Sequence, residues 1–214
     1  MTGGLTIAVP RGALFQPTLD VLDGLGVDTA EIRSNERRLV FPEIGVITMR
    51  PSDVPSYVEH GAADVGVTGR DVLREQSDRD VYELLDLRFG RCRMIVASRA
   101  DGDALGESLR RLGRVRIATK YPRIAARHFA DTGRQAEIVE VKGSVELAPL
   151  TGMVEAIVDL TQTGTTLREN GLVVREELFA STARLIANPV AHKLKASGLD
   201  RLVAAGRERG RVTA

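Results

Sequence analysis

The segment with the clearest chemistry runs from Ala156 to Leu167, where an apolar strand passes through a Thr- and Gly-rich loop into the start of a helix. A helix N-terminus carries unpaired backbone N–H groups and a partial positive charge, so it favours an anion. Gly164 has no Cβ, which lets the backbone approach that anion closely. The pattern predicts a cradle for a phosphate monoester, formed without a lysine by Thr161, Gln162, Thr163, Gly164, Thr165 and Thr166.

Asp159 comes just before this loop, near the end of the apolar strand. Its carboxylate would repel a phosphate, but it suits a ribose, whose vicinal hydroxyls can donate hydrogen bonds to it. An acid directly before a phosphate cradle therefore predicts a site for a 5-phosphorylated ribose. The competing interpretation is a Thr-rich helix cap that binds nothing. The loop has neither the G-x-x-x-x-G-K-[ST] nor the G-x-G-x-x-G pattern of nucleotide-binding loops.

The elements that must position these residues alternate between short apolar strands and amphipathic helices along most of the chain. This alternation predicts an α/β fold with mainly parallel sheets. The strands are too many for one sheet of this length, so we expect two lobes, residues 1–90 plus 181–214 and residues 91–180. A single last helix is expected over Ala191 to Arg209. Two lobes leave a cleft, and loops at the carboxyl ends of parallel strands face such crevices.

Composition excludes several classes of protein. The 214 residues carry 30 basic and 29 acidic side chains, which is ordinary globular composition. The single cysteine, Cys92, cannot form an intrachain disulfide, so we expect a reducing, cytoplasmic setting. No stretch of the sequence approaches 18 consecutive apolar residues, so we expect no membrane span. The absence of Trp and the few Tyr and Phe argue against nucleic-acid stacking. The three histidines lack the spacing of metal ligands.

Several segments, in the same order along nearly the whole chain, carry a recognisable pattern. They are Val9–Gly12, Arg37–Pro42, Arg50–Pro55, Gly61–Asp71, Ala118–Pro122, Gly143–Pro149, Asp159–Leu167 and Asn170–Leu172. Together they resemble the ATP phosphoribosyltransferase family, which opens histidine biosynthesis. The resemblance implies two lobes of the periplasmic-binding-protein type II kind with an active-site cleft between them. It also implies a reaction in which N1 of the adenine of ATP displaces pyrophosphate from C1 of phosphoribosyl pyrophosphate, with Mg²⁺ accompanying the pyrophosphate.

This chemistry requires cations aimed at a leaving group that gains negative charge, and no protein nucleophile. The resemblance assigns Arg37 and Arg50 to the active site, and Arg11 stands where the family often has Lys. A surface ion pair is the alternative for each arginine. The acids Glu146 and Glu155 are expected on the sugar and metal side, although the family often has Asp in place of Glu155. Gly69, Lys120 and Tyr121 are expected beside the nucleotide, and the alternative for Lys120 and Tyr121 is a basic loop with a half-buried tyrosine.

The family has a long form with a histidine-binding regulatory domain and a short form without one. The length of this chain is similar to the short form, which implies a hetero-octamer of four catalytic chains and four subunits that resemble histidyl-tRNA synthetase. Residues 184–214 carry a charge of +5, and the last helix could face that partner. We expect a homo-oligomer as well, and neither a nucleic-acid nor a membrane partner. The alternatives are a salvage-type phosphoribosyltransferase and a non-catalytic sensor related to binding proteins.

Overall fold

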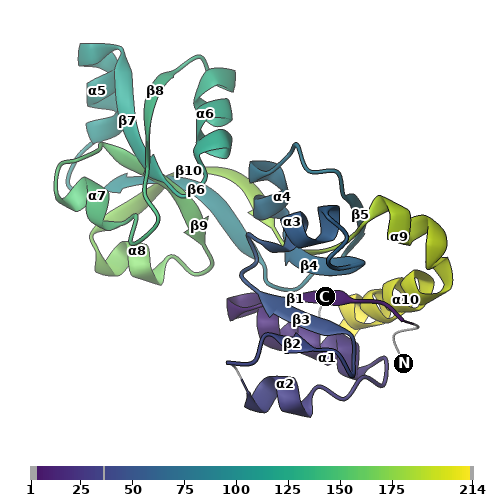
Figure 1. Ribbon diagram of the computed structural model, residues 1–214. Coiled ribbons are helices and arrows are strands. Elements are labelled where there is room, and N and C mark those ends of the chain that lie inside the picture. Colours follow the sequence, from purple (N-terminus) through teal and green to yellow (C-terminus); the bar gives the residue numbers. More distant parts are fainter. Residues whose placement is uncertain (1–3, 36, 213–214) are drawn as a thin grey trace. The chain divides into compact units, whose positions relative to one another are not determined.

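The computed structural model describes residues 4–35 and 37–212, with side chains of the last helix described up to residue 208. They form two compact units. The first unit combines the chain up to Arg91 with the segment from Thr182 onward, and the second unit is Cys92–Ser181. The first unit is therefore assembled from two separate stretches of sequence. Figure 1 labels most of the helices and strands of both units.

The first unit contains a sheet with the strand order β2-β3-β1-β4-β11-β5. Its middle strands β3, β1 and β4 are parallel, and Ile7 lies in register with Val46 on one side and Val65 on the other. Short runs rich in β-branched apolar residues suit strands that are covered on both faces. The strand bounds are β1 Ile7–Pro10, β2 Val40–Phe41, β3 Val46–Met49, β4 Val65–Gly69, β5 Tyr82–Asp86 and β11 Ala183–Ala187.

Helices cover both faces of this first sheet. On one face, Leu19 and Leu22 share a buried cluster with Val9 and with Leu202 of the last helix. On the other face, Val54 packs in a second cluster around Ala8 and Ile186. The helix bounds are η1 Gly12–Leu14, α1 Phe15–Asp23, α2 Ala30–Ser34, α3 Val54–Glu59, α4 Arg70–Glu75, α9 Pro189–Leu194 and α10 Ala196–Val212.

The second unit contains a sheet with the strand order β10-β6-β9-β7-β8. The neighbours β9, β7 and β8 are parallel, and Thr119 lies in register with Val158 on one side and Glu140 on the other. The bounds are β6 Cys92–Arg99, β7 Arg114–Thr119, β8 Gln135–Glu140, β9 Ala156–Thr161 and β10 Leu172–Ser181.

Alternate residues of the central strands supply two separate cores in the second unit. Met94 and Val96 of β6 pack with residues of helices α5 and α6, whereas Ile95 and Ala97 pack with residues of α7 and α8. This alternation follows from the two-residue period of a strand. Figure 1 shows the two pairs of helices on opposite sides of the sheet. The bounds are α5 Ala104–Leu112, α6 Pro122–Asp131, α7 Leu147–Leu150 and α8 Thr165–Glu169.

Both sheets are mixed, so the expectation of mainly parallel sheets is wrong for their remaining strands. Strands β5 and β11 pair antiparallel in the first unit, as do β6 and β10 in the second. These are the strands that precede or follow a passage of the chain from one unit to the other. No helix intervenes at either passage, so the strand–helix alternation that produces parallel neighbours is interrupted there.

The last helix is also interrupted, because α9 ends at Leu194 and α10 begins at Ala196. Lys195 lies between them with φ −123° and ψ 31°. Its Nζ donates hydrogen bonds to Asp64 Oδ2 at 2.7 Å and to the carbonyl of Gly4 at 3.0 Å. The break therefore coincides with a tie to residues near the start of β1 and β4. Apolar periodicity alone does not reveal such a tie, and the sequence interpretation continued the helix through it.

Candidate active site

Most of the residues predicted to bind the sugar and its phosphate lie at the carboxyl ends of the neighbouring strands β7 and β9 of the second unit, where β9 continues three residues beyond the end of β7. Thr119 and Val158 are in register, so Lys120 and Asp159 follow at the same level. Lys120 Nζ lies 4.0 Å from Asp159 Oδ2, and the Asp159 side chain is 13% exposed. Ligands of open α/β sheets bind outside the carboxyl ends of the strands. Lys120 and Asp159 therefore lie at the end of the sheet where such a ligand would bind.

Thr119 fixes the beginning of the turn that follows β7. Its hydroxyl donates to the carbonyl of Val158 at 2.7 Å and accepts from the backbone N–H of Tyr121 at 2.9 Å. Because this hydroxyl joins the last residue of β7 to Val158 in the middle of β9, it holds Lys120 and Tyr121 beside Asp159. The Tyr121 ring is half-buried against the core shared with α5 and α6.

The Thr- and Gly-rich loop joins β9 to α8 and remains at the surface. Gln162, Thr163, Thr165 and Thr166 are exposed. Gly164 lies directly before the helix with φ +73°, a left-handed conformation that an L side chain rarely adopts. Its N–H donates to Thr161 Oγ1 at 3.0 Å, which closes the turn. The predicted loop is thus a defined turn with its hydroxyls accessible to solvent.

Arg168, which the sequence interpretation did not include, contacts this loop directly. Its Nη1 donates to the carbonyl of Thr163 and its Nη2 donates to Thr165 Oγ1, each at 3.0 Å. The only signal in the sequence is its spacing, since residues three and four positions apart share a helix face. That spacing puts the guanidinium over Gly164 and Thr165.

Glu155 does not join the group around the loop. It precedes β9, four residues before Asp159, so it lies about 13 Å away along the strand. Its carboxylate accepts hydrogen bonds from the Arg116 backbone N–H at 2.7 Å and from Arg116 Nη2 at 2.6 Å. Burial would raise the pKa of Glu155, but these bonds from Arg116 hold it below its usual value. Glu146 is half-buried directly before α7.

The residues predicted in the first unit lie at the carboxyl edge of its parallel strands. Arg11 follows β1, Arg50 follows β3 and Gly69 ends β4, and these strands are neighbours. Arg37 precedes β2, which runs antiparallel to β3, so its segment reaches the same edge. Arg37 and Arg50 are exposed. The ends of β1 and β3 and the start of β2 therefore bring three arginines to the same edge of this sheet.

Arg11 differs from the other two arginines, because its guanidinium is bonded within the fold. Its Nη2 donates to the carbonyl of Arg38 at 3.1 Å and to Thr48 Oγ1 at 3.0 Å. Its Nε donates to the same hydroxyl at 3.1 Å. These bonds fix the segment after Arg37 against β3. Arg11 thus holds the segment that contains Arg37 and Arg38 against β3.

Gly69 is the N-cap residue directly before α4, in a position too tight for a larger residue. A Cβ on Gly69 would lie 2.2 Å from Asp71 Oδ1, and the Asp71 carboxylate is buried. The backbone of Gly69 and the side chain of Asp71 are therefore packed too closely to accommodate even an alanine without movement.

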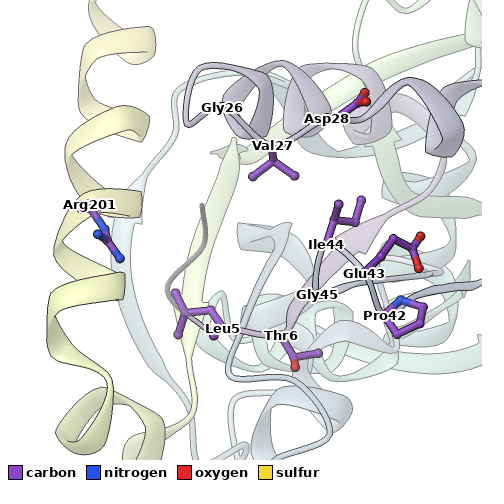
Figure 2. Close-up of a pocket in the computed structure, with 11 residues that line it drawn as sticks. Leu5, Thr6, Gly26, Val27, Asp28, Pro42, Glu43, Ile44, Gly45 and Arg201 are labelled. Carbon is purple, nitrogen blue, oxygen red and sulfur yellow. The ribbon is translucent and has the colours of Figure 1, made fainter.

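A cavity of about 790 Å³ lies in the first unit at the opposite end of the strands. Figure 2 shows it bounded by Leu5 and Thr6 before β1, by Ile44 and Gly45 before β3, and by Arg201 of α10. Arg11 and Arg50 follow the same strands at their other ends, so the cavity contains none of the predicted site residues.

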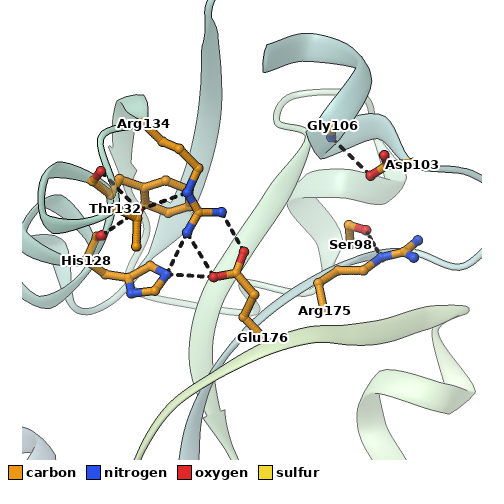
Figure 3. Close-up of polar contacts among 9 residues, drawn as sticks. Ser98, Asp103, Gly106, His128, Thr132, Arg134, Arg175 and Glu176 are labelled. Carbon is orange, nitrogen blue, oxygen red and sulfur yellow. Dashed lines mark hydrogen bonds and ion pairs between the residues drawn. The ribbon is translucent and has the colours of Figure 1, made fainter. Parts of the chain in front are cut away.

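A second polar cluster joins α6 to β10 in the second unit, as Figure 3 shows. Glu176 Oε2 lies 2.9 Å from His128 Nε2 and 2.8 Å from Arg134 Nη2. Hydrogen bonds from Arg134 lower the pKa of Glu176 by more than burial raises it, and His128 lowers it further. Glu176 follows a bulge in β10, and the bulge residue Arg175 donates to Ser98 Oγ at 2.8 Å. The cluster fastens an edge strand to a helix.

Within residues 4–35 and 37–212, no three His, Cys, Asp or Glu side chains form a group able to hold a metal. In the same part of the chain, no helix is both long and apolar enough to cross a bilayer.

Comparison with known proteins connects this geometry to a family. The family model HisG, described as ATP phosphoribosyltransferase, matches residues 50–207. An ATP phosphoribosyltransferase from Rubrobacter xylanophilus is 52% identical over 96% of both chains, and ATP phosphoribosyltransferase 2 from Geobacter sulfurreducens is 45% identical over 91% of this chain and 93% of its own. The ATP phosphoribosyl transferase (HisG:HisZ) complex from Thermotoga maritima matches with a TM-score of 0.82 and 32% identity, covering 97% and 98% of the two chains.

The sulphonate-binding protein SsuA from Escherichia coli shares the fold alone, with a TM-score of 0.61 and 13% identity over 98% of this chain and 73% of its own. The fold is therefore that of the type II periplasmic binding proteins, and in this chain it carries a Thr–Gly loop two residues after Asp159. The fold places the chain in the class of two-unit α/β proteins of the binding-protein type. The chain belongs to the ATP phosphoribosyltransferase family, whose members are pentosyltransferases.

Proposed function

We propose that this chain transfers the 5-phosphoribosyl group of phosphoribosyl pyrophosphate to N1 of the adenine of ATP, which yields phosphoribosyl-ATP and pyrophosphate. The observation that carries the proposal is the exposed Thr–Gly turn with Asp159 just before it, at the end of β9. Family membership supplies the reaction, and the turn supplies the residues that would hold the sugar ester.

In this proposal the 5-phosphate binds to the hydroxyls and backbone N–H groups of Thr161 to Thr166. Asp159 accepts hydrogen bonds from the ribose hydroxyls, and Glu146 approaches the sugar from the segment before α7. Lys120, 4.0 Å from Asp159, neutralises that carboxylate before the sugar arrives and then contacts the nucleotide together with Tyr121. Gly69 contributes to the nucleotide site through its backbone. We leave Glu155 out of the site, because Arg116 occupies its carboxylate.

The arginines act on the leaving group in this scheme. As the bond from C1 to the pyrophosphate oxygen breaks, the electron pair leaves with pyrophosphate and negative charge accumulates there. Arg37 and Arg50 are exposed and can each donate two hydrogen bonds to phosphate oxygens. Arg11 acts mainly by holding the Arg38 segment. Because the attacking atom belongs to ATP, the protein needs to supply no nucleophile.

The divalent metal that this family uses is, we propose, Mg²⁺ carried by the substrate. The described donors at the two strand edges are hydroxyls, guanidiniums and single carboxylates, which suit an anion and do not form a metal cage. Mg²⁺ keeps several waters and binds readily through substrate phosphates. The residues therefore do not fit a resident metal, and no step of the scheme requires a metal ligand on the chain.

The partner in this proposal is a subunit that resembles histidyl-tRNA synthetase, in a hetero-octamer of four and four. Support comes from the Thermotoga maritima structure, a HisG:HisZ complex. Co-elution of the two proteins from a gel-filtration column, at a volume that neither shows alone, tests the assembly. Separate elution at all mixing ratios would reject it. The proposed site of action in the cell is the cytoplasm.

The activity is tested by incubating the chain with ATP, phosphoribosyl pyrophosphate, Mg²⁺ and pyrophosphatase, with and without the partner subunit. We expect an adenine-modified nucleotide whose formation requires all substrates. A salvage-type enzyme would instead consume free adenine or another nucleobase and leave ATP unchanged. A sensor would bind a ligand and yield no product, so the three functions give different results in one set of reactions.

A further inference from the structure

We infer that Arg168 is a positioning residue that acts through the Thr165 hydroxyl to orient the hydroxyl of Thr163 as a hydrogen-bond donor to an anion. This inference deepens the proposed function and rests on it. Arg168 belongs to α8 and reaches back over the loop that precedes its own helix. Its Nη1 donates to the carbonyl of Thr163 and its Nη2 to Thr165 Oγ1, each at 3.0 Å.

Gly164 makes this reach possible. A Cβ on Gly164 would lie 3.3 Å from Arg168 Nη1, which is tighter than most Cβ contacts. The φ of +73° at Gly164 already disfavours a side chain. The glycine therefore serves two purposes, since it allows the left-handed turn and leaves space for the guanidinium above it.

The direction of the hydrogen bonds follows from the chemistry of the groups. A guanidinium only donates, so Thr165 Oγ1 accepts from Arg168. Thr165 Oγ1 lies 3.0 Å from Thr163 Oγ1, and geometry alone allows either hydroxyl to donate. Because the guanidinium polarises the Thr165 hydroxyl and makes it the better donor, we take Thr165 as the donor to Thr163. Thr163 Oγ1 also accepts from the Thr165 backbone N–H at 3.4 Å.

Thr163 Oγ1 then has both lone pairs engaged, and a hydroxyl has only one proton. That proton remains for an acceptor outside the loop. The order Arg168 to Thr165 to Thr163 thus sets Thr163 as a dedicated donor, and the guanidinium charge polarises the bonds along the chain. A site arranged in this way prefers a phosphate oxygen to a cation or to a ligand that donates.

Replacement of Arg168 tests the arrangement. We expect Arg168→Gln to raise the KM for phosphoribosyl pyrophosphate about tenfold or more, as for loss of a charge-assisted hydrogen bond, while the KM for ATP and kcat change by less than about threefold. Arg168→Lys keeps the charge but lacks the rigid planar fork that bonds both acceptors in a fixed geometry, so we expect an intermediate value. Arg99→Gln is the control, because Arg99 forms an exposed pair with Asp101 at the opposite edge of the sheet.

A double-mutant cycle distinguishes an effect of Arg168 through the hydroxyls of Thr165 and Thr163 from a direct attraction between Arg168 and phosphate. If Arg168 acts through Thr163, then Arg168→Gln in a Thr163→Val background raises the KM by less than about twofold. An undiminished effect in that background overturns the inference. So does an equal rise in the KM values for both substrates, or a thermal unfolding midpoint that falls with Arg168→Gln in proportion to the lost activity.

Calorimetric titration with ribose 5-phosphate distinguishes the inference from the proposed function. Binding to the wild-type chain with about tenfold weaker binding to Arg168→Gln supports both. Equal binding to both proteins overturns the inference and leaves the proposed function standing. A wild-type chain that binds no ribose 5-phosphate and forms no product overturns both.

Discussion

At the residue scale, the chemistry depends on a small number of charged and hydroxyl groups whose neighbours determine what each can do. Asp159 and Glu155 are both acids of one strand segment, yet only Asp159 lies beside the loop. Arg116 binds Glu155 instead. In the same way, bonds within the fold engage Arg11, whereas Arg37 and Arg50 are exposed. The residue type alone does not distinguish these roles, because the role of each residue is set by the side chains around it.

Asp159→Asn should weaken binding of the ribose while leaving the loop intact. An amide accepts hydrogen bonds less strongly than a carboxylate, so we expect the KM for phosphoribosyl pyrophosphate to rise about tenfold. Steady-state kinetics with saturating ATP measure the effect. Asp131→Asn, at an exposed position at the end of α6, is the matched control. A KM equal to that of the wild type would remove Asp159 from the sugar site.

Arg50→Gln should lower kcat more than it raises KM, because its charge matters most when pyrophosphate departs. Loss of one preorganised donor predicts a fall in kcat on the order of 100-fold. The measurement is the initial rate at saturating concentrations of both substrates. A normal kcat with a raised KM would assign Arg50 to ground-state binding alone.

Glu176→Gln should destabilise the second unit at neutral pH by about 1–2 kcal/mol, because Arg134 and His128 lose a charged partner. The pKa of Glu176 lies below its ordinary value of 4.5, so its contribution is present above that pH and is lost as the pH falls through the lowered pKa. Thermal unfolding midpoints of wild type and variant should therefore differ at pH 7 and converge below pH 4.5.

The control for that measurement is Glu177→Gln, since Glu177 forms an exposed pair with Arg93 that contributes about 1 kcal/mol at most. A difference in unfolding midpoint between wild type and Glu176→Gln that stays the same as the pH falls would contradict the role of the carboxylate charge.

At the element scale, the strand ends place the site, and close helix packing holds the strands in place. In the first unit, α3 crosses β4 directly over Gly66, and a Cβ there would lie 2.4 Å from Val54 Cγ1 and 3.0 Å from Val58 Cγ2. These valines are buried and stiff at χ1. The glycine therefore sets the distance between helix and sheet beside the strand that ends at Gly69.

Gly66→Ala should lower the free energy of unfolding by about 1–3 kcal/mol, as other overpacked cores do. Chemical denaturation measures the change. Gly102→Ala is the matched control, because nothing lies within 4 Å of the Cβ it would add and its φ is not positive. A Gly66→Ala protein as stable as the Gly102→Ala protein would show that α3 can move away from the sheet at little cost.

The positions of most helices and strands follow from the local sequence, because buried runs and caps are local signals. The strand–loop–helix segment around Gly164 is the clearest case. The break at Lys195 coincides with a hydrogen bond to Asp64, 131 positions earlier in the chain, and the antiparallel strands other than β2 border the passages of the chain between units. Arg168 was missed for a similar reason, since an arginine on an exposed helix carries no mark of the loop it covers. Contacts between distant parts of the chain and the direction of a surface side chain are determined by the folded structure, so the local sequence does not reveal them.

At the scale of the whole molecule, the fold alone does not determine the activity. SsuA has the same fold at 13% identity, whereas the Rubrobacter xylanophilus enzyme shares 52% of its sequence with this chain. A fold hosts many functions, and the site distinguishes them. The proposed activity of this chain depends on binding of the anionic end of the sugar substrate to the loop from Thr161 to Thr166.

The most direct test is an amide NMR spectrum of the chain recorded during titration with ribose 5-phosphate. The account predicts that the largest shifts occur at the backbone N–H groups between Thr161 and Leu167, and that they are lost in the Gly164→Val protein. Shifts that cluster instead around the cavity bounded by Leu5, Ile44 and Arg201, with the loop unchanged, would contradict it.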